Sequence, residues 1–447
     1  MQAVSLRVQA PGPQARPRGA RHPKRGLLGT LLVSAWLAGL GPAQTARADD
    51  LADLDALTLA DAPPTTTQPA ARDWQAFAEL AFGQFTAPNE SVTTNHRLSL
   101  DLQVDTAIAP RWRAVLADRL DGKWPPQMGD EHYINTLKEA YVSWQATDER
   151  LLDLGRVNVR NGVATGYNPT DYFRNGAVRS MVSSDPGSLK KNRLGSVMLR
   201  GQTLWNGGSL TALASPKMAE QASDTAFSPD YGATNNQNRW LLALSQRLTE
   251  KISPQWLLYG EDRQPAQLGL NLTTLVGDAS VLFAEWSGGQ SRSQLSQAGL
   301  TADDTSFHTR VATGVTYTAG NKLSMTLEYA CNDAALNADQ WSALQRGSPL
   351  AYGRYRAWAQ AAQELPTQDM LGLYANWPDA IVPHLDLGAM LRANRADNSR
   401  THWVEARYHW SHTDLAVQLQ VNSGGPTSDY GAAPQQRIWQ LSLRQYF

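Results

Sequence analysis

From Trp74 to the C-terminus, apolar and polar residues alternate along the chain with a period of two. In the stretch RLSLDLQV (97–104), for example, every second residue is apolar and the residues between are polar or charged. This period is that of a β-strand with one apolar face, so we predict an all-β protein with roughly 16–18 strands of ~9–13 residues. Further clear segments are 238–248, 322–329, 385–392 and 415–422.

The connections between the predicted strands are of two kinds. Tight turns rich in Gly, Pro and polar residues are predicted at 108–111, 249–253, 318–321 and 411–414. Long polar stretches occupy 215–236, 288–304, 332–365 and 423–436. Short turns at one end and long loops at the other are typical of a transmembrane antiparallel up-and-down β-barrel, with short periplasmic turns and long outer loops. Alternation by itself also fits a soluble β-domain whose polar face meets water.

The two faces of the strands differ in a way that favours the membrane. Tryptophans at the ends of the apolar face resemble two interfacial girdles: Trp112, Trp144, Trp205, Trp377, Trp410 and Trp439. Charges occupy the middle of the other face, where lipid contact would cost several kcal/mol each, so we expect them to line an aqueous interior. They are Asp101, Glu139, Arg200, Arg239, Arg247, Glu328, Asp386, Arg392, Glu405, Arg407 and Arg444.

The N-terminus carries the features of a secretory signal peptide. A basic stretch (16–25) precedes a short apolar stretch (26–40), and Ala46-Arg47-Ala48 fits a cleavage site. We therefore predict a signal peptide at 1–48, a flexible acidic and Pro-rich segment at 49–73, and a barrel at 74–447. The roughly 25 residues before the barrel are too few for the plug of an energy-coupled receptor, whose closed lumen needs a far larger domain.

Composition excludes several classes of function. The leader's seven basic residues leave 33 basic and 41 acidic residues from Asp49 onward, so no general basic excess indicates a nucleic-acid partner. Cys331 is the single cysteine, which excludes a disulfide framework and a cysteine-based metal site. After the leader no apolar run reaches 18 residues, the length that a membrane-spanning helix needs.

Two stretches resemble known outer-membrane proteins. The last strand, with apolar residues at alternate positions and a final Phe447, resembles the C-terminal insertion signal of Gram-negative outer-membrane proteins, although Ser442 and Gln445 depart from it. The segment 137–162, through Gly155, Arg156 and Gly162, resembles porins and alginate-export-type channels. The resemblance implies a location in the outer membrane, contacts with its lipid and lipopolysaccharide, and recognition of the Phe447 strand by the barrel-assembly machinery.

One long segment between two predicted strands has an anomalous charge. Gly155 to Gly201 holds eight basic residues and two acidic ones, and its central part is predicted as a long basic loop at 158–193. Loops of this length are usually functional or disordered. Our hypothesis is that it folds into the lumen as a basic constriction that selects anions. The alternative is an outer loop whose arginines bind lipopolysaccharide phosphates. The candidate lumen-binding residues are Arg156, Arg160, Arg174, Arg179, Lys190, Lys191, Arg193 and Arg200, with Tyr172 and Phe173 from NPTDYFR (168–174), a stretch that also fits a plain turn.

The sequence thus predicts an outer-membrane channel for passive passage of a solute or polymer, with a preference for anions. The alternative is a surface barrel with a closed lumen that binds or anchors a polysaccharide through Trp and Arg. We predict no enzyme, cofactor or metal, because nucleophile-elbow and phosphate-loop motifs are absent. His409 and His412 could touch a metal, but exposed histidines of a hairpin are more often surface or lumen groups.

Overall fold

A computed structural model describes residues 73–125, 132–223 and 225–447. The predicted signal peptide (1–48) and all but the last residue of the predicted N-terminal segment (49–73) lie outside the described residues. The described chain is dominated by eighteen β-strands. They are β1 (Trp74–Thr86), β2 (Val92–Ala109), β3 (Trp112–Trp124), β4 (Tyr133–Thr147), β5 (Arg150–Val157), β6 (Ser196–Trp205), β7 (Gly208–Ser215), β8 (Arg239–Gln246), β9 (Gln255–Glu261), β10 (Gln264–Val276), β11 (Ser280–Ser291), β12 (Ser306–Thr318), β13 (Ser324–Asn332), β14 (Asp369–Trp377), β15 (Leu385–Asn394), β16 (Arg400–His409), β17 (Thr413–Ser423) and β18 (Arg437–Tyr446).

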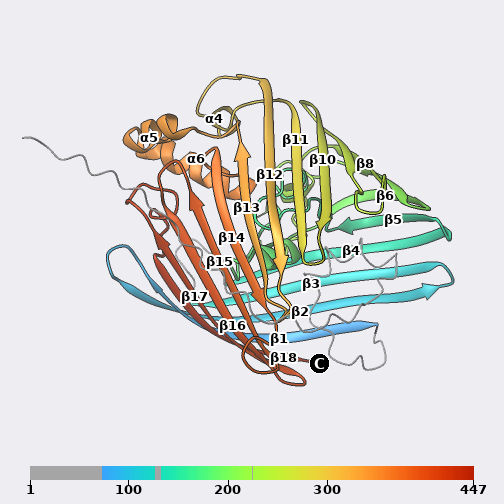
Figure 1. Ribbon diagram of the computed structural model, residues 1–447, viewed down its shortest axis with the longest axis horizontal. Helices are drawn as coiled ribbons and strands as arrows, with labels where there is room; N and C mark the ends of the chain where they lie inside the picture. Colours follow the sequence, from blue (N-terminus) through green and yellow to red (C-terminus); the bar gives the residue numbers. More distant parts are fainter. Residues whose placement is uncertain (1–72, 126–131, 224) are drawn as a thin grey trace, which may run out of the picture. The chain divides into compact units, whose positions relative to one another are not determined.

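These strands form one closed antiparallel β-barrel (Figure 1). Each strand pairs with its neighbour in sequence, and β1 also pairs with β18, with Leu80 opposite Leu443. Closure leaves no sheet edge exposed, which is the condition for a β-structure in lipid. The predicted fold class and strand number are therefore confirmed. None of the helices in the described residues has the length and hydropathy of a membrane-spanning helix.

The period of two sorts the side chains between the outside and the inside of the barrel. On β2, Leu100 is exposed on the outer face while its neighbour Asp101 is buried on the inner face. The predicted tryptophans stand on the outer face near strand ends, and Trp112 stacks on Trp144 with ring centroids 5.7 Å apart. One predicted inner-wall charge is wrong, because β8 ends at Gln246 and Arg247 lies in the turn that follows.

Five short helices lie in the long connections: α2 (Pro186–Lys191), α3 (Tyr231–Thr234), α4 (Gln294–Gln297), α5 (Ala338–Arg346) and α6 (Pro349–Ala362). Figure 1 shows α4, α5 and α6 together at the long-loop end of the barrel. They share a small apolar core around Trp341 and Tyr355, both fully buried. A capping box of Asn337 and Gln340 starts α5.

Candidate lumen constriction

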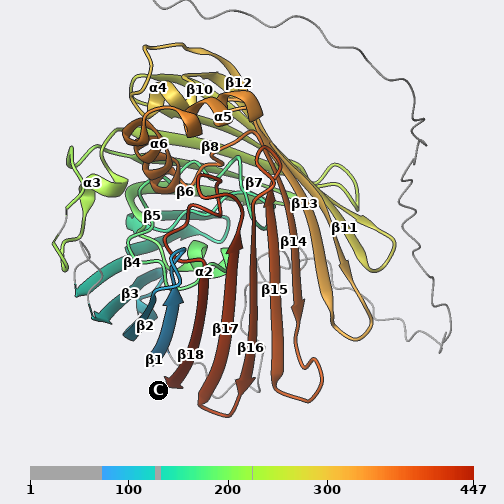
Figure 2. The ribbon, with the colours of Figure 1, turned by 90° about the vertical axis from the view of Figure 1, so that its left-hand side faces the viewer.

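The connection between β5 and β6, residues 158–195, lies inside the barrel; we call it the lumen loop (Figure 2). Its hydrogen bonds reach inner-wall residues on strands far apart around the barrel. Ser184 Oγ donates to Gln420 Oε1 on β17 over 2.5 Å, and the Tyr172 hydroxyl lies 2.9 Å from Ser287 Oγ on β11. The loop therefore crosses the interior, as the constriction hypothesis requires, and its bounds extend the predicted 158–193 by two residues.

Local sequence explains the one helix of the lumen loop. Pro186 occupies the first turn of α2, where its missing N–H costs nothing. The Asp185 carboxylate caps this turn by accepting a hydrogen bond from Ser188 N over 2.7 Å. Lys190 and Lys191 form the last turn, where positive charge is favourable. Part of the basic character of the segment thus stabilises α2.

Two buried glutamates of the inner wall hold the lumen loop by its backbone. Glu285 on β11 accepts hydrogen bonds from the backbone N–H groups of Val163, Ala164 and Thr170 over 2.7–3.2 Å. Glu328 on β13 accepts from the N–H groups of residues 165–167 over 2.8–3.2 Å. Both glutamates are fully buried. Because a carboxylate accepts several such bonds at once, each glutamate satisfies a whole turn of backbone that would otherwise be unpaired.

Two glycines allow this close approach. Gly162 has φ +101°, and an added Cβ would lie 2.6 Å from a Glu285 carboxylate oxygen. A Cβ on Gly166 would lie 1.7 Å from the Tyr374 hydroxyl oxygen. Any larger residue would therefore push the loop away from its carboxylates. Gly162 is also one of the residues behind the resemblance to porins.

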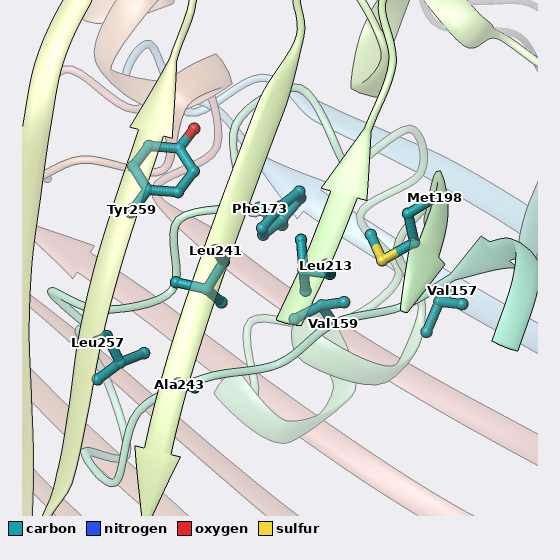
Figure 3. Packing of buried hydrophobic residues seen from close by; sticks show 9 residues of the cluster. All are labelled: Val157, Val159, Phe173, Met198, Leu213, Leu241, Ala243, Leu257 and Tyr259. Carbon is teal, nitrogen blue, oxygen red and sulfur yellow. The ribbon is translucent and has the colours of Figure 1, made fainter. Parts of the chain in front are cut away.

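An apolar contact adds to these hydrogen bonds. Val159 and Phe173 of the lumen loop pack on inward-facing residues of β6 to β9, which Figure 3 shows at close range: Met198, Leu213, Leu241, Ala243, Leu257 and Tyr259. The ring of Tyr172 stacks on that of Tyr259 with centroids 4.4 Å apart. Burial raises the pKa of Tyr172 to about 12, so its hydroxyl stays protonated. Tyr172 and Phe173 thus contact the wall of the barrel.

Most of the predicted basic site residues have partners within the protein. Arg193 forms a buried bidentate pair with Asp171 over 2.7 and 3.0 Å. Arg200 pairs with Asp153 over 2.7 Å, and Lys190 Nζ donates to the Ala164 carbonyl over 3.0 Å. Arg179 lies 3.4 Å from the Asp230 carboxylate, outside the lumen loop.

Arg156 and Arg160 behave differently from this group. Arg156 lies on the face of β5 that carries the exposed Leu152 and Leu154, and it donates to the carbonyls of Gly195 and Pro229. It is therefore separated from the inner wall. Arg160 is exposed and forms no ion pair with any described residue. Lys191 is also exposed.

Glu364 connects the lumen loop to the long connection that carries α5 and α6. Its carboxylate lies 2.5 Å from the Arg174 guanidinium and accepts a hydrogen bond from the Tyr167 hydroxyl over 2.7 Å. Burial alone would raise the pKa of Glu364, but the charges of Arg174 and Arg310 outweigh it and hold this pKa below its usual range. The Gly176 N–H also donates to the Ala361 carbonyl over 3.1 Å.

Sequence analysis did not distinguish two inner-wall arginines from the others. Arg310 on β12 approaches one carboxylate, with Nε 3.8 Å from Glu364. Arg392 on β15 forms no ion pair or hydrogen bond with a described residue. Other polar atoms without a partner lie around it on β14 and β16, namely the Tyr374 hydroxyl, Thr401 Oγ1 and Trp403 Nε1. No local signal marks either arginine, since each fits the same alternation as its paired counterparts.

Apart from Arg392, the remaining inner wall, from β15 through β18 to β4, pairs most of its charges within or across strands; we call it the charged wall. Glu79 lies 2.8 Å from Arg97 and 2.7 Å from Arg444. Lys138 lies 2.7 Å from Asp101. His409 bridges the Asp414 and Asp386 carboxylates over 2.8 and 3.1 Å, so both of its ring nitrogens are engaged.

Comparison with known proteins identifies the fold. No protein-family model matches the chain, and no curated protein matches its sequence. Solved structures match 84% of this chain: Acinetobacter baumannii OccAB1 (9% identity, 96% of that chain, TM-score 0.55), Pseudomonas aeruginosa OccK2 (OpdF) in complex with glucuronate (10%, 97%, 0.54) and the Pseudomonas aeruginosa outer membrane protein OpdK (8%, 99%, 0.50). The chain thus has the fold of these outer-membrane porins, which confirms the predicted resemblance at the level of fold and fits an outer-membrane location.

Proposed function

We propose that this protein is an outer-membrane channel through which a small solute diffuses passively, and that the lumen loop forms its constriction. The observation that carries the proposal is a long loop held inside a closed barrel by two buried carboxylates. A barrel of 16–18 strands encloses a lumen wide enough for water. A loop fixed across such a lumen narrows it at a defined depth.

The proposed preference for anions rests on guanidinium groups that form no ion pair with a described residue, or only a long one. On the inner wall, Arg392 forms no ion pair with a described residue and Arg310 forms only a long one, 3.8 Å from Glu364, while Arg160 adds exposed positive charge on the lumen loop. In a narrow aqueous path, such charges lower the entry barrier for anions. Arg174, Arg179 and Arg193 contribute by holding the constriction in shape. The glucuronate in the OccK2 structure makes a sugar carboxylate a reasonable first cargo to test.

The other proposed partners are those expected for a protein located in the outer membrane. We propose that the outer face contacts lipid and lipopolysaccharide, and that the barrel-assembly machinery recognises the β18 strand ending in Phe447. The Phe447 N–H donates to the Ala76 carbonyl over 3.0 Å, so this end is joined to β1 once the barrel has closed.

Conductance of the purified protein in planar bilayers tests the channel directly. We expect single-channel currents and a reversal potential that favours anions. Arg392→Gln combined with Arg310→Gln should lower the anion-to-cation permeability ratio about twofold or more, because Arg392 forms no ion pair with a described residue and Arg310 forms only a long one with Glu364. Arg97→Gln is the matched control, since Glu79 already neutralises Arg97 at 2.8 Å.

Two outcomes would count against the proposal. Folded protein that inserts but never conducts would favour the closed, polysaccharide-anchoring barrel. Conduction with an unchanged permeability ratio in the double variant would leave the channel standing and remove these arginines as the source of selectivity.

A further inference from the structure

Two arginines stand on the outer face of the barrel, at its long-loop end. Arg400 is the first residue of β16 and Arg437 is the first residue of β18, and both are exposed. Each lies on the same face of its strand as exposed apolar residues, such as Val404 on β16 and Trp439 on β18. Apart from the neutral His402, they are the ionisable residues on the outward face of the described strands β15 to β18. This part of the outer face therefore carries positive charge and no acid.

Strand pairing gathers these side chains into one patch. Val421 of β17 pairs with His402 on one side and with Arg437 on the other, so the three residues form a row across the outer face. Because adjacent strands lie about 4.8 Å apart, His402 and Arg437 are separated by roughly 10 Å. Arg400 is two residues from His402 on the same face and pairs with Ser423 of β17. A phosphate group placed over β17 is therefore within reach of both long arginine side chains.

Neither guanidinium group has an acidic partner among the described residues. The side chains of Arg400 and Arg437 form no ion pair or hydrogen bond there, although the adjoining connections hold the acids Glu90, Asp397 and Asp429. Two of these acids are engaged elsewhere: Asp397 accepts a hydrogen bond from Trp341 Nε1 over 2.8 Å, and Asp429 accepts one from Asn394 Nδ2 over 3.2 Å. The positive charge of the patch is therefore available to an anion from outside the chain.

The depth of the patch matches the phosphate level of a membrane. Trp439 occupies the next outward position after Arg437 on β18 and is 42% exposed. Outward tryptophans of this kind mark the boundary between hydrocarbon and lipid headgroups. Arg437 thus stands at the headgroup level. The exposed Val404, Val417 and Leu419, further toward the middle of β16 and β17, offer an apolar surface to acyl chains.

We propose that the outer face of β16 to β18 binds lipopolysaccharide of the outer leaflet at a specific site, with a lipid A phosphate held by Arg400 and Arg437. The site rests on the proposed outer-membrane location but not on conduction by the barrel. Guanidinium groups bind phosphate through paired, charge-assisted hydrogen bonds, and basic patches at this depth bind lipid headgroups. A second copy of the chain fits poorly, because two cationic patches repel each other. A soluble polyanion fits poorly too, because it leaves the apolar residues next to the patch uncovered.

Titration of the purified, refolded protein with bisphosphorylated lipid A, followed by native mass spectrometry, tests the site. Arg400→Gln combined with Arg437→Gln should weaken binding about tenfold or more, because the phosphate loses both guanidinium partners. Arg150→Gln combined with Arg247→Gln is the matched control and should bind as the parent does. Both control arginines are exposed at the opposite end of the barrel and form no ion pair with a described residue. Lipid A stripped of its phosphates should bind the parent as weakly as intact lipid A binds the Arg400/Arg437 variant.

Three results would overturn the proposal: a parent protein that does not bind lipid A, a folded Arg400/Arg437 variant that binds it as tightly as the parent, or phosphatidylglycerol bound as tightly as lipid A. Heat-dependent gel mobility confirms that each variant is folded. Single-channel recording separates this site from the channel. Weakened lipid A binding with unchanged conductance supports the site, and a parent that binds lipid A but never conducts supports the site while counting against the channel alone.

Discussion

The two sides of the barrel's inner wall use charge for different purposes. From β10 to β14, the buried carboxylates of Glu285 and Glu328 bind the backbone of the lumen loop. On the charged wall, Glu79 and Asp101 bind basic side chains of neighbouring strands. The first arrangement holds the lumen loop in position, whereas the second stabilises only the wall itself.

This difference shows why the number of charges on an inner wall does not predict the electric field in the lumen. A carboxylate that accepts backbone N–H bonds holds the lumen loop in position. A wall charge that is neutralised by its neighbour contributes little to the electric field in the lumen. An arginine such as Arg392, whose guanidinium forms no ion pair with a described residue, keeps more of its field. Selectivity should therefore depend on a few unpaired groups, while loop position depends on the buried acids.

Removal of both loop-binding acids should have the largest effect. Glu285→Ala with Glu328→Ala leaves buried backbone N–H groups without acceptors, at a cost of about 1–3 kcal/mol for each group. We expect the lumen loop to leave its position and single-channel conductance to rise about twofold or more. Glu405→Ala on the charged wall, whose partner Arg407 lies 2.9 Å away, is the control and should conduct as the parent does. Equal conductance in all three proteins would show that the loop does not set the narrowest point.

Two arginines of the lumen loop test the difference between a buried, paired charge and an exposed one. Arg193→Gln leaves Asp171 buried and unpaired, so we expect a loss of about 3–5 kcal/mol in unfolding free energy. Arg160→Gln should change it by less than about 0.5 kcal/mol, because Arg160 is exposed. Thermal unfolding in detergent, followed by circular dichroism, measures both. Similar destabilisation by the two substitutions would refute the distinction.

Acidification should give the smallest effect, through Glu364. Its pKa is depressed in the folded protein, so its stabilising contacts are complete above the ordinary glutamate pKa of about 4.3 and are lost as pH falls through the lower, folded value. We expect the α6 connection to loosen from the lumen loop below about pH 4, with a step in conductance. Glu364→Gln should abolish this step. A step that persists unchanged in the variant would assign it to another group.

Several features followed from local sequence, and others did not. The alternation in 97–104 predicted β2 and the face of each residue, and the polar stretches predicted the long loops. The excess of basic residues predicted a functional role for the lumen loop. Its composition could not show that Tyr172 and Phe173 pack on the wall or that Arg156 lies on the other face of β5. Those outcomes depend on strands that are remote in sequence.

The sequence by itself determined the strands and the face on which each residue lies, because a period of two is a property of neighbouring residues and does not depend on distant contacts. Only the tertiary structure decided which charges are free. Arg174 meets a carboxylate 190 positions away, and Tyr167 is bound by Glu328 across 161 positions. Whether a buried charge is neutralised depends on such contacts, and closure of the barrel brings them together.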